Sequence, residues 1–404
     1  MVRPPGIAPR GWGRAAFGDM GYEGARVVGY RKNTLVGGER VRVALVHDWL
    51  LTMGGAERVL EAVADLYPDA PIFSLVANPE ALSPRLAHRV HVQSRLARMP
   101  YARRWYRRYL PFMPAAIEGL DLQDFDLVLS DCSAVSKGVR TRPDAVHVSY
   151  IHTPMRYLWD LYAAYRREAG PAGRLVMSWS FPRLRRWDYA AAQRPTRLMA
   201  NSHAVAARIQ THYGRPSVVV PPPVDVDRFT PDAPRQDYHL VLSRLVAYKR
   251  FDLAVEAANR LGVRLIVAGD GPERERLARL AGPTVTMVGA PTDRAAATLL
   301  EGARSLWFPG EEDFGIVMAE ALAAGTPVVA YGAGGALDIV ADGDTGILFG
   351  SQTVDGLVDA VERLAHLPLD HHHLRQAALG FDVSHFRAGY QAVVAEALAA
   401  RGSA

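Results

Sequence analysis

The sequence predicts an α/β fold made of two Rossmann-like domains, each with a doubly wound parallel sheet, that face each other across a cleft. Apolar runs of strand length alternate with helical patterns from residue 41 onward, as in repeated strand–helix units. These runs are apolar at nearly every position, which is typical of parallel strands buried on both faces. The rhythm stops at Pro221-Pro222-Pro223 and then restarts, so we expect two domains. Ligands of such sheets bind at the carboxyl ends of the strands, which places the expected site in the cleft.

The length of 404 residues suits two domains of ordinary size with additional tails. We divide the chain where its composition changes. The segments are a Gly-, Arg- and Pro-rich leader expected to be disordered (1–40), an N-terminal domain (41–215), a Pro-rich linker (216–238), a C-terminal domain (239–380) and a C-terminal helix (381–404). The last helix is amphipathic, so an apolar face is available to pack back on the N-terminal domain.

Each half of the chain contains strand candidates in order. In the first half, β-branched and apolar runs occupy Val41–Val46, Leu127–Leu129, Val146–Ile151 and Leu198–Ala200. Gly54-Gly55 follows the first of these runs and opens a helical pattern. In the second half, the runs occupy His239–Leu242, Arg264–Ala268, Val285–Val288, Ser305–Phe308, Pro327–Ala330 and Gly346–Phe349. A helix is expected from about Phe251 to Leu261.

The composition excludes several classes of protein. Hydrophobic residues make up 49% and charged residues 22% of the chain, the balance of a globular protein rather than a disordered one. No apolar run approaches the ~20 residues that a membrane-spanning helix needs. Cys132 is the single cysteine, which excludes an intramolecular disulfide and a cysteine-rich metal site and fits the reducing cytoplasm. The run His371-His372-His373 is interpreted as solvated surface in a linker.

The formal net charge of +5 is modest, but its distribution is uneven. Six arginines lie between Arg95 and Arg108, interleaved with Tyr101, Trp105 and Tyr106. Such a basic, aromatic stretch fits a peripheral contact with an anionic membrane at the inner face of the plasma membrane. The same pattern also fits a solvated helix face whose aromatic rings pack inward. We expect no nucleic-acid partner.

The most informative segment is the one from Phe308 to Pro327. A strand ends at Phe308, a loop carries Glu312, and a helix begins near Gly315. The free backbone N–H groups at the start of that helix, at Phe314, Gly315 and Ile316, suit a phosphate group. Glu320 falls in the second turn of the helix. Carboxylates accept hydrogen bonds only, and they therefore match sugar and ribose hydroxyls well.

Glu312 and Glu320, separated by seven residues and followed by Ala-Gly-Thr-Pro, resemble the E-x7-E signature of the retaining glycosyltransferases of family 4. The resemblance extends from about residue 41 to 395 and implies the GT-B fold, with an N-terminal acceptor domain and a C-terminal donor-nucleotide domain. It further implies that Glu320 binds the nucleotide ribose and that Glu312 lies at the donor sugar. Arg244 and Lys249 match the family segment in which two cations clamp the donor diphosphate. Physically, such cations stabilise the leaving group as it becomes negative.

Three further segments resemble parts of the family's site. Gly269-Asp270 matches a turn near the nucleotide base, although a generic strand-to-helix turn explains it nearly as well. Gly54-Gly55 matches the amino-terminal loop that approaches donor and acceptor. His152 follows a strand and matches a position that contacts the donor sugar. The stretch around His152 also leans toward the mannosyltransferase-like branch of polysaccharide synthesis.

The resemblance implies transfer of a hexose, mannose favoured, from a nucleoside-diphosphate sugar to a glycan or lipid-linked acceptor, with retention at the anomeric carbon. GDP-mannose is the first candidate for the donor and UDP-hexoses are the next. With Arg244 and Lys249 available for the diphosphate, we expect neither a metal nor another cofactor. Two alternatives stay open: a sugar-nucleotide epimerase of the same architecture, and a non-catalytic subunit that binds membrane or polysaccharide.

Overall fold

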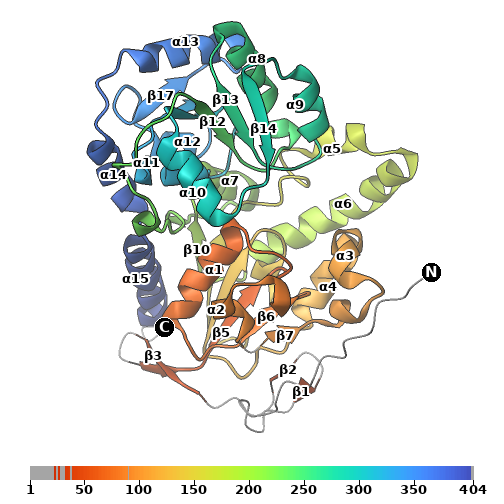
Figure 1. The fold of residues 1–404 in the computed structure, drawn as a ribbon. Helices are drawn as coiled ribbons and strands as arrows, with labels where there is room; N and C mark the ends of the chain where they lie inside the picture. Colours follow the sequence, from red (N-terminus) through yellow and green to blue (C-terminus); the bar gives the residue numbers. More distant parts are fainter. Residues whose placement is uncertain (1–21, 24–25, 28–31, 37–38, 90, 402–404) are drawn as a thin grey trace, which may run out of the picture.

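The protein folds into two stacked α/β domains (Figure 1). The structure is a computed structural model, and it describes residues 22–23, 26–27, 32–36, 39–89 and 91–401. Each domain is built on one sheet whose strand pairs are all parallel, and helices cover both sheet faces. The predicted fold class is therefore confirmed.

The N-terminal domain contains a seven-stranded sheet in the order β11-β10-β9-β8-β5-β6-β7. Its strands in chain order are β5 (Val43–His47), β6 (Ile72–Ser74), β7 (His91–Gln93), β8 (Leu127–Cys132), β9 (Val146–Ile151), β10 (Arg197–Ala200) and β11 (Val218–Val219). Every residue of β5, β8 and β9 is buried, as expected for central strands covered on both faces.

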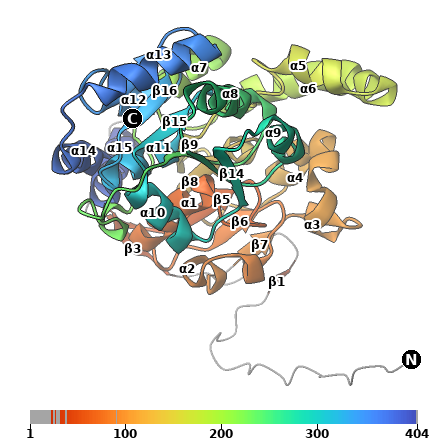
Figure 2. The same ribbon diagram turned by 45° about the horizontal axis from the view of Figure 1, so that its top comes forward.

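The helices of this domain differ in how closely they follow the sheet. They are α1 (Gly55–Leu66), α2 (Pro84–Ala87), α3 (Ala102–Trp105), α4 (Met113–Glu118), α5 (Tyr162–Glu168), α6 (Pro171–Ala192) and α7 (His203–Tyr213). Helices α5 and α6 form an arm that projects from the side of the domain in both views (Figures 1 and 2).

The C-terminal domain contains a six-stranded sheet in the order β14-β13-β12-β15-β16-β17. Its strands are β12 (His239–Leu242), β13 (Leu265–Ala268), β14 (Val285–Gly289), β15 (Ser305–Phe308), β16 (Val328–Tyr331) and β17 (Gly346–Phe349). Its helices are α8 (Phe251–Leu261), α9 (Arg274–Leu280), α10 (Asp293–Gly302), α11 (Ile316–Ala323), α12 (Ala336–Ile339), α13 (Val354–Ala365) and α14 (His371–Ala378).

Short 3-10 helices complete the described elements. They are η1 (Pro79–Ala81), η2 (Arg95–Arg98), η3 (Tyr106–Phe112), η4 (Ser136–Gly138), η5 (Val226–Arg228), η6 (Ala247–Lys249) and η7 (Leu379–Phe381). The His371–His373 run, interpreted from sequence as part of a solvated linker, instead begins α14. The ring of His371 lies 2.8 Å from the carbonyl oxygen of Gly325, while His372 and His373 remain exposed.

Helix α15 (Val383–Arg401) returns from the C-terminal domain and lies along the N-terminal one (Figure 1). Its buried residues join the core formed by α1, β5, β8 and β9. They are Phe386, Tyr390, Val393, Val394, Ala397 and Leu398. Val224 of the linker pairs in parallel with Asp382 just before the helix, so the two crossings between the domains run side by side.

The described part of the expected leader contains two antiparallel pairs of short strands. These are β1 (Tyr22–Glu23) with β2 (Arg26–Val27), and β3 (Thr34–Val36) with β4 (Glu39–Val41). Most of the leader, residues 1–21 included, lies outside the described residues, so the prediction of disorder there is not addressed.

Candidate active site

One cleft of about 740 Å³ lies between the two domains, at the carboxyl ends of both sheets. Its walls come from the loops after β5, β8 and β9 in one domain and from those after β12, β13 and β15 in the other. All the residues selected from the sequence line it. They are Gly54, Gly55, His152, Arg244, Lys249, Gly269, Asp270, Glu312, Phe314, Gly315, Ile316 and Glu320.

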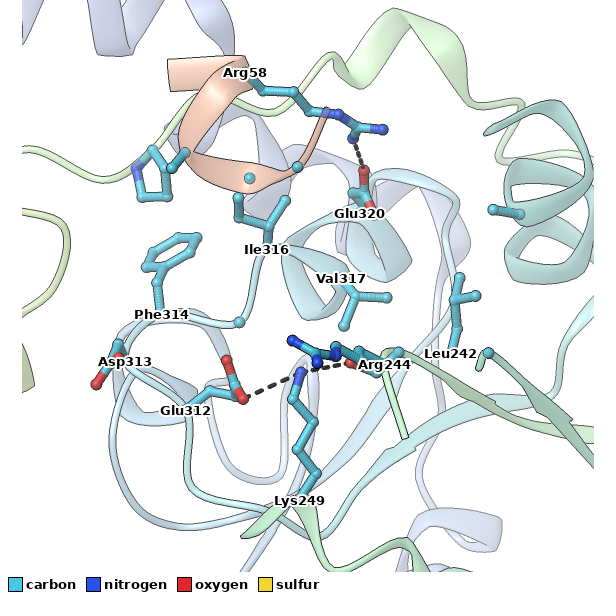
Figure 3. A pocket seen from close by; sticks show the side chains of 18 of the residues that line it. Arg58, Leu242, Arg244, Lys249, Glu312, Asp313, Phe314, Ile316, Val317 and Glu320 are labelled. Atoms are coloured by element: carbon cyan, nitrogen blue, oxygen red, sulfur yellow. Dashed lines mark hydrogen bonds and ion pairs between the residues drawn. The ribbon is translucent and has the colours of Figure 1, made fainter. Parts of the chain in front are cut away.

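Lys249 is the cation at the centre of the C-terminal wall. Its Nζ lies 3.2 Å from Oε1 of Glu312 and donates a hydrogen bond of 2.6 Å to the hydroxyl of Ser243 (Figure 3). The side chains of Lys249 and Glu312 are both mostly buried. The two contacts hold the lysine at a fixed position facing the cleft.

Arg244 lies beside Lys249 in the same wall (Figure 3). Its side chain is exposed to the cleft, and within the part of the chain that the structure describes we find no carboxylate paired with it. Its guanidinium is permanently charged and presents five N–H donors. The wall therefore offers one cation held by a carboxylate and one cation available for an anionic ligand.

Two helix N-termini meet in the cleft from opposite domains. Helix α11 begins after Gly315, and helix α1 begins after Gly54. A side chain at Gly55 would place its Cβ 2.9 Å from Cδ1 of Ile316, so the start of α1 packs closely against the start of α11. The first amides of each helix have no partner within the helix, and both helix dipoles direct their positive ends here. This arrangement suits a phosphate group.

Glu320 reaches the cleft from the second turn of α11. Its Oε1 lies 2.9 Å from a guanidinium nitrogen of Arg58, which belongs to α1, and 3.1 Å from one of Arg228, which belongs to the linker (Figure 3). Arg58 also pairs with Asp293 of α10 at 3.1 Å. Among the described residues we find no partner for Oε2 of Glu320. One carboxylate oxygen is thus held by two arginines while the other is free to accept.

His152 is fixed by a buried carboxylate rather than standing alone. Its Nε2 lies 2.5 Å from Oδ1 of Asp131, whose Oδ2 lies 2.8 Å from Nδ1 of His47. The side chain of Asn201 donates to the carbonyl oxygen of His152 at 3.0 Å. With Nε2 committed to Asp131, Nδ1 is the ring atom of His152 that is left for a ligand.

The same chain of groups carries shifted pKa values. Burial alone would lower the pKa of His47, but the carboxylates of Asp131 and Glu57 outweigh it and raise the pKa to about 10. Burial would raise the pKa of Asp131, but the charge of His152 and the contacts with both histidines hold it below its usual range. A cationic His47 and an ionised Asp131 therefore stand behind His152.

Gly269 and Asp270 form the turn after β13. A Cβ at Gly269 would lie 1.8 Å from the carbonyl oxygen of Ser243, which excludes any side chain there. Asp270 accepts a hydrogen bond from the amide of Gly271 at 2.8 Å, and its side chain is exposed. The turn therefore closes tightly against the β12 loop and presents one carboxylate at the edge of the cleft.

Comparison with protein families identifies the chain. A model described as Glycosyltransferase Family 4 matches residues 53–228, and one described as Glycosyl transferases group 1 matches residues 226–380. Together the two matches include all the cleft residues selected from the sequence. The chain belongs to the family 4 glycosyltransferases. The resemblance inferred from its motifs is confirmed.

Curated relatives of this glycosyltransferase share only part of their length with it. The D-inositol 3-phosphate glycosyltransferase of Mycolicibacterium paratuberculosis is 35% identical over 199 residues, which are 43% of this chain and 45% of the relative. The enzyme of the same name from Mycobacterium tuberculosis (strain ATCC 25177 / H37Ra) is 35% identical over 198 residues, 42% of this chain and 41% of the relative. The chain thus spans less than half the length of these relatives.

Solved structures show that this glycosyltransferase has the GT-B fold. Sucrose-phosphate synthase from Thermosynechococcus elongatus superposes with a TM-score of 0.67 at 18% identity, covering 89% of this chain and 99% of that one. Anabaena HepE, solved in complex with UDP and glucose, gives a TM-score of 0.63 at 18% identity with the same coverage.

Several residues in the cleft or directly behind it were not singled out from the sequence of this glycosyltransferase. Arg58 stands beside the Gly54-Gly55 motif, and that proximity was an available signal. Arg228 belongs to a linker segment that sequence alone presents as architecture, yet it contacts Glu320. Asp131 is an acidic residue inside a buried strand, which marks it as paired. Nothing local in the sequence marks Asp313, whose side chain binds Arg208 of the other domain.

The described residues contain neither a cluster of metal ligands nor a membrane-spanning helix. No three His, Cys, Asp or Glu side chains in the described ranges gather as a metal site would require. No helix in the same ranges is long and apolar enough to cross a membrane.

Proposed function

We propose that this chain transfers a hexose from a nucleoside-diphosphate sugar to the hydroxyl of a glycan or lipid-linked acceptor in polysaccharide or glycolipid synthesis, with retention at the anomeric carbon. One observation carries the proposal. Arg244, Lys249 and the N-terminus of α11 gather positive charge on one wall, with Glu312 and Glu320 on either side of it. A diphosphate flanked by two sugars has the complementary pattern of charge and hydroxyl groups.

In this proposal Glu320 binds the ribose through its free Oε2, and Arg244 and Lys249 bind the diphosphate. Glu320 lies 2.9 Å from Arg58, and Lys249 lies 3.2 Å from Glu312, so both side chains are held in place in the cleft. Phe314, Gly315 and Ile316 offer their amides to the same diphosphate, as Gly54 and Gly55 do from the opposite wall. Gly269 and Asp270 lie at the end of the cleft assigned to the nucleotide base.

The proposed chemistry is a same-face substitution. The bond from the anomeric carbon to the leaving diphosphate breaks, and a bond to the acceptor oxygen forms on the same face of the sugar. The acceptor proton passes to the leaving phosphate. Lys249 and Arg244 stabilise the growing negative charge on that phosphate. Glu312 and His152 contact the donor sugar, and Glu312 stabilises positive charge on the sugar ring.

Mannose remains the favoured hexose, with GDP-mannose as donor and UDP-hexoses as the alternative. HepE was solved with UDP-glucose, which makes UDP-glucose the first alternative to test. We propose that Arg244 and Lys249 neutralise the diphosphate without a metal ion.

The segment Arg95–Arg108 bears on localisation. All six of its arginines are exposed, as are Tyr101 and Trp105. Tyr106 is instead half-buried against Trp49, with ring centroids 4.9 Å apart. Some aromatic rings thus pack inward and others face outward with the arginines. We propose a cytoplasmic protein that makes peripheral contact with an anionic membrane through this segment.

The decisive experiment supplies the purified chain with a panel of labelled nucleotide sugars and with lipid-linked acceptors, with and without EDTA. We expect one donor to be consumed, and proton NMR of the product to show the anomeric configuration of the donor. Activity that survives EDTA supports the metal-independent reaction. If the donor is epimerised without transfer, the chain is a sugar-nucleotide epimerase. If donors bind but no product forms, the chain is a non-catalytic subunit.

A further inference from the structure

The arm formed by α5 and α6 carries an apolar tip that no described residue covers. Leu175 is 73% exposed, Trp179 is 61% exposed and Val176 is 53% exposed. Leu175 and Trp179 lie one helical turn apart, and Val176 is adjacent to Leu175. The three side chains therefore form one face near the start of α6. Exposed apolar side chains grouped in this way mark an interaction surface rather than ordinary surface decoration.

The opposite face of α6 holds the arm rigidly to the domain. Phe181 packs between Tyr157 and Tyr162, with ring centroids at 6.3 and 5.7 Å. Nearer the base, the carboxylate of Asp188 is fully buried and lies 2.5 Å from Nζ of Lys137. The outward direction of Leu175 and Trp179 is therefore set by a well-packed helix.

The charge of the arm is strongly positive. Residues 162–192 contain six arginines and two acidic residues, and one of the two, Asp188, is buried in its pair with Lys137. Arg183 is exposed and lies over the ring of Trp179, with its guanidinium carbon 4.6 Å from the ring centroid. Arg174 is exposed beside Leu175. The apolar tip is thus bordered by cations.

This combination fits an anionic lipid surface better than another protein chain. Tryptophan and leucine enter the interfacial region of a bilayer while neighbouring arginines remain at the headgroups. A second copy of the chain would bring the same positive surface against itself, and like charges repel across such an isologous contact. The arm and α3 also project on the same side of the N-terminal domain (Figures 1 and 2), so both basic regions can face one membrane.

The base of the arm lies next to the catalytic cleft. The chain enters the arm shortly after His152, through a segment that contains Arg156. The guanidinium of Arg156 lies 3.8 Å from the carboxylate of Asp313 and 5.4 Å from the ring centroid of Tyr248. Asp313 is the neighbour of Glu312 in the donor wall. A docked arm therefore brings the edge of the cleft close to the bilayer.

We propose that the α5–α6 arm docks on anionic membranes by inserting Leu175, Val176 and Trp179 between the headgroups, and that the acceptor is lipid-linked. The docking stands independently of the proposed function, whereas the acceptor class rests on it. A lipid-linked acceptor reaches the cleft from the membrane on which the arm rests, so it need not leave the bilayer.

The test labels the arm itself. Cys132 is buried, and burial raises the pKa of its thiol to about 12, so it does not compete for thiol reagents. The exposed Ser178 is replaced (Ser178→Cys) and labelled with a polarity-sensitive dye; a matched control carries Ser351→Cys in the C-terminal domain. Each labelled full chain is mixed, without donor, with vesicles of phosphatidylcholine alone or of phosphatidylcholine with phosphatidylglycerol.

We expect a blue shift from the arm dye with the anionic vesicles only, and none from the control dye. In the unlabelled chain, Leu175→Ser with Trp179→Ser should weaken vesicle co-sedimentation at least tenfold, because each buried apolar side chain contributes about tenfold or more. Val288→Ser, which removes an exposed apolar side chain from β14, should leave vesicle co-sedimentation unchanged.

Replacing Arg103, Arg104, Arg107 and Arg108 by serine tests the second basic region separately. We expect vesicle affinity to fall about fivefold for each arginine that contacts the membrane.

Three results would overturn the docking inference. The first is that the arm dye remains exposed to water on anionic vesicles. The second is that the Leu175/Trp179 variant sediments with vesicles as the wild-type chain does. The third is that the wild-type chain is a dimer and the variant a monomer, which would make a second copy of the chain the partner. If the arm docks and transfer to lipid-linked and soluble acceptors is equal, the acceptor class is wrong while the docking stands. If no donor is used at all, the proposed function fails and the docking result is unaffected.

Discussion

Glu312 and Glu320 share one motif but have different surroundings in the cleft. Glu320 is held through one oxygen by Arg58 and Arg228, so its geometry is set before any ligand arrives. Glu312 instead pairs with Lys249. Burial, followed by the negative charge of Glu312, raises the pKa of Tyr248, which therefore stays protonated beside it. The carboxylate of Glu320 is therefore placed to anchor a ligand. The carboxylate of Glu312 shares its charge with Lys249, a cation that faces the ligand.

Replacing these residues should separate binding from turnover. In the proposed function Lys249 stabilises the leaving phosphate, so Lys249→Ala should lower kcat by about 10²-fold to 10³-fold. Glu320 is proposed to bind the ribose, so Glu320→Ala should weaken nucleoside-diphosphate binding about tenfold, with a smaller effect on kcat. Calorimetry with the nucleoside diphosphate and steady-state kinetics measure the two effects. Lys32→Ala, which removes an exposed pair with Asp69, is the control. Wild-type rates in both variants would show that the site assignment is wrong.

The sequence predicted residues within motifs better than residues that act through long-range contacts. Glu312, Glu320, Arg244 and Lys249 were selected because they match family motifs in the segments that follow predicted strands. Arg58 contacts Glu320 across a separation of 262 residues. No periodicity or spacing encodes such a contact, because it depends on how the two domains are placed.

At the scale of the element, strands that contain an apolar run were predicted, whereas β6 and β7 were not. The central strands β5, β8 and β9 are buried along their whole length and correspond to the apolar runs of the sequence. Strands β6 and β7 have three residues each, too few for a run to stand out. Their formation depends on a parallel neighbour, which local pattern does not reveal.

The position of helix α15 was not predictable from the periodicity of its sequence alone, because it depends on packing against the N-terminal domain. Tyr390 is 1% exposed, and its ring lies near those of Tyr150 in β9 and Phe386, with centroids at 6.3 and 5.5 Å. The helix thereby covers one face of the N-terminal sheet although its chain comes from the C-terminal domain.

Truncating Tyr390 should therefore destabilise the N-terminal domain. Tyr390→Ala removes a buried aromatic ring and leaves a cavity, which costs about 3 kcal/mol or more of unfolding free energy. Tyr189→Ala, at an exposed tyrosine on α6, should cost little. Urea unfolding followed by circular dichroism gives both values. Equal midpoints for the two variants would mean that α15 does not contribute to the core of that domain.

At the scale of the whole molecule, repeated strand–helix units made the two-domain fold predictable, whereas the closed arrangement of the domains was not. Closure depends on contacts that pair charges from distant parts of the chain. Arg208 of α7 binds Asp313 and, at 2.6 Å, Glu311. The hydroxyl of Ser202 donates to the carbonyl oxygen of Asp313 at 2.5 Å, and the amide of His203 donates to Asp338 at 2.8 Å. These contacts hold α7 against the C-terminal domain.

Removing Arg208 should open the cleft. Burial raises the pKa of Asp313, and the charges of Arg156 and Arg208 oppose that rise, so Arg208→Ala leaves a buried carboxylate poorly compensated. The domains then separate to hydrate it. We expect a larger radius of gyration in solution scattering without ligand, and about tenfold weaker donor binding, because Gly54, Gly55 and His152 no longer reach the donor. Saturating donor should restore the closed scattering profile.

The matched control is Arg363→Ala, which removes an exposed pair with Asp342 inside the C-terminal domain. It should change neither the scattering nor the affinity, since surface pairs contribute roughly 0–1 kcal/mol. If Arg208→Ala keeps the radius of gyration and the donor affinity of the wild-type chain, the contacts of α7 with the C-terminal domain do not set closure. Closure would then depend on other contacts between the domains, such as those of Arg58 in α1 with Glu320 and Asp293 of the C-terminal domain.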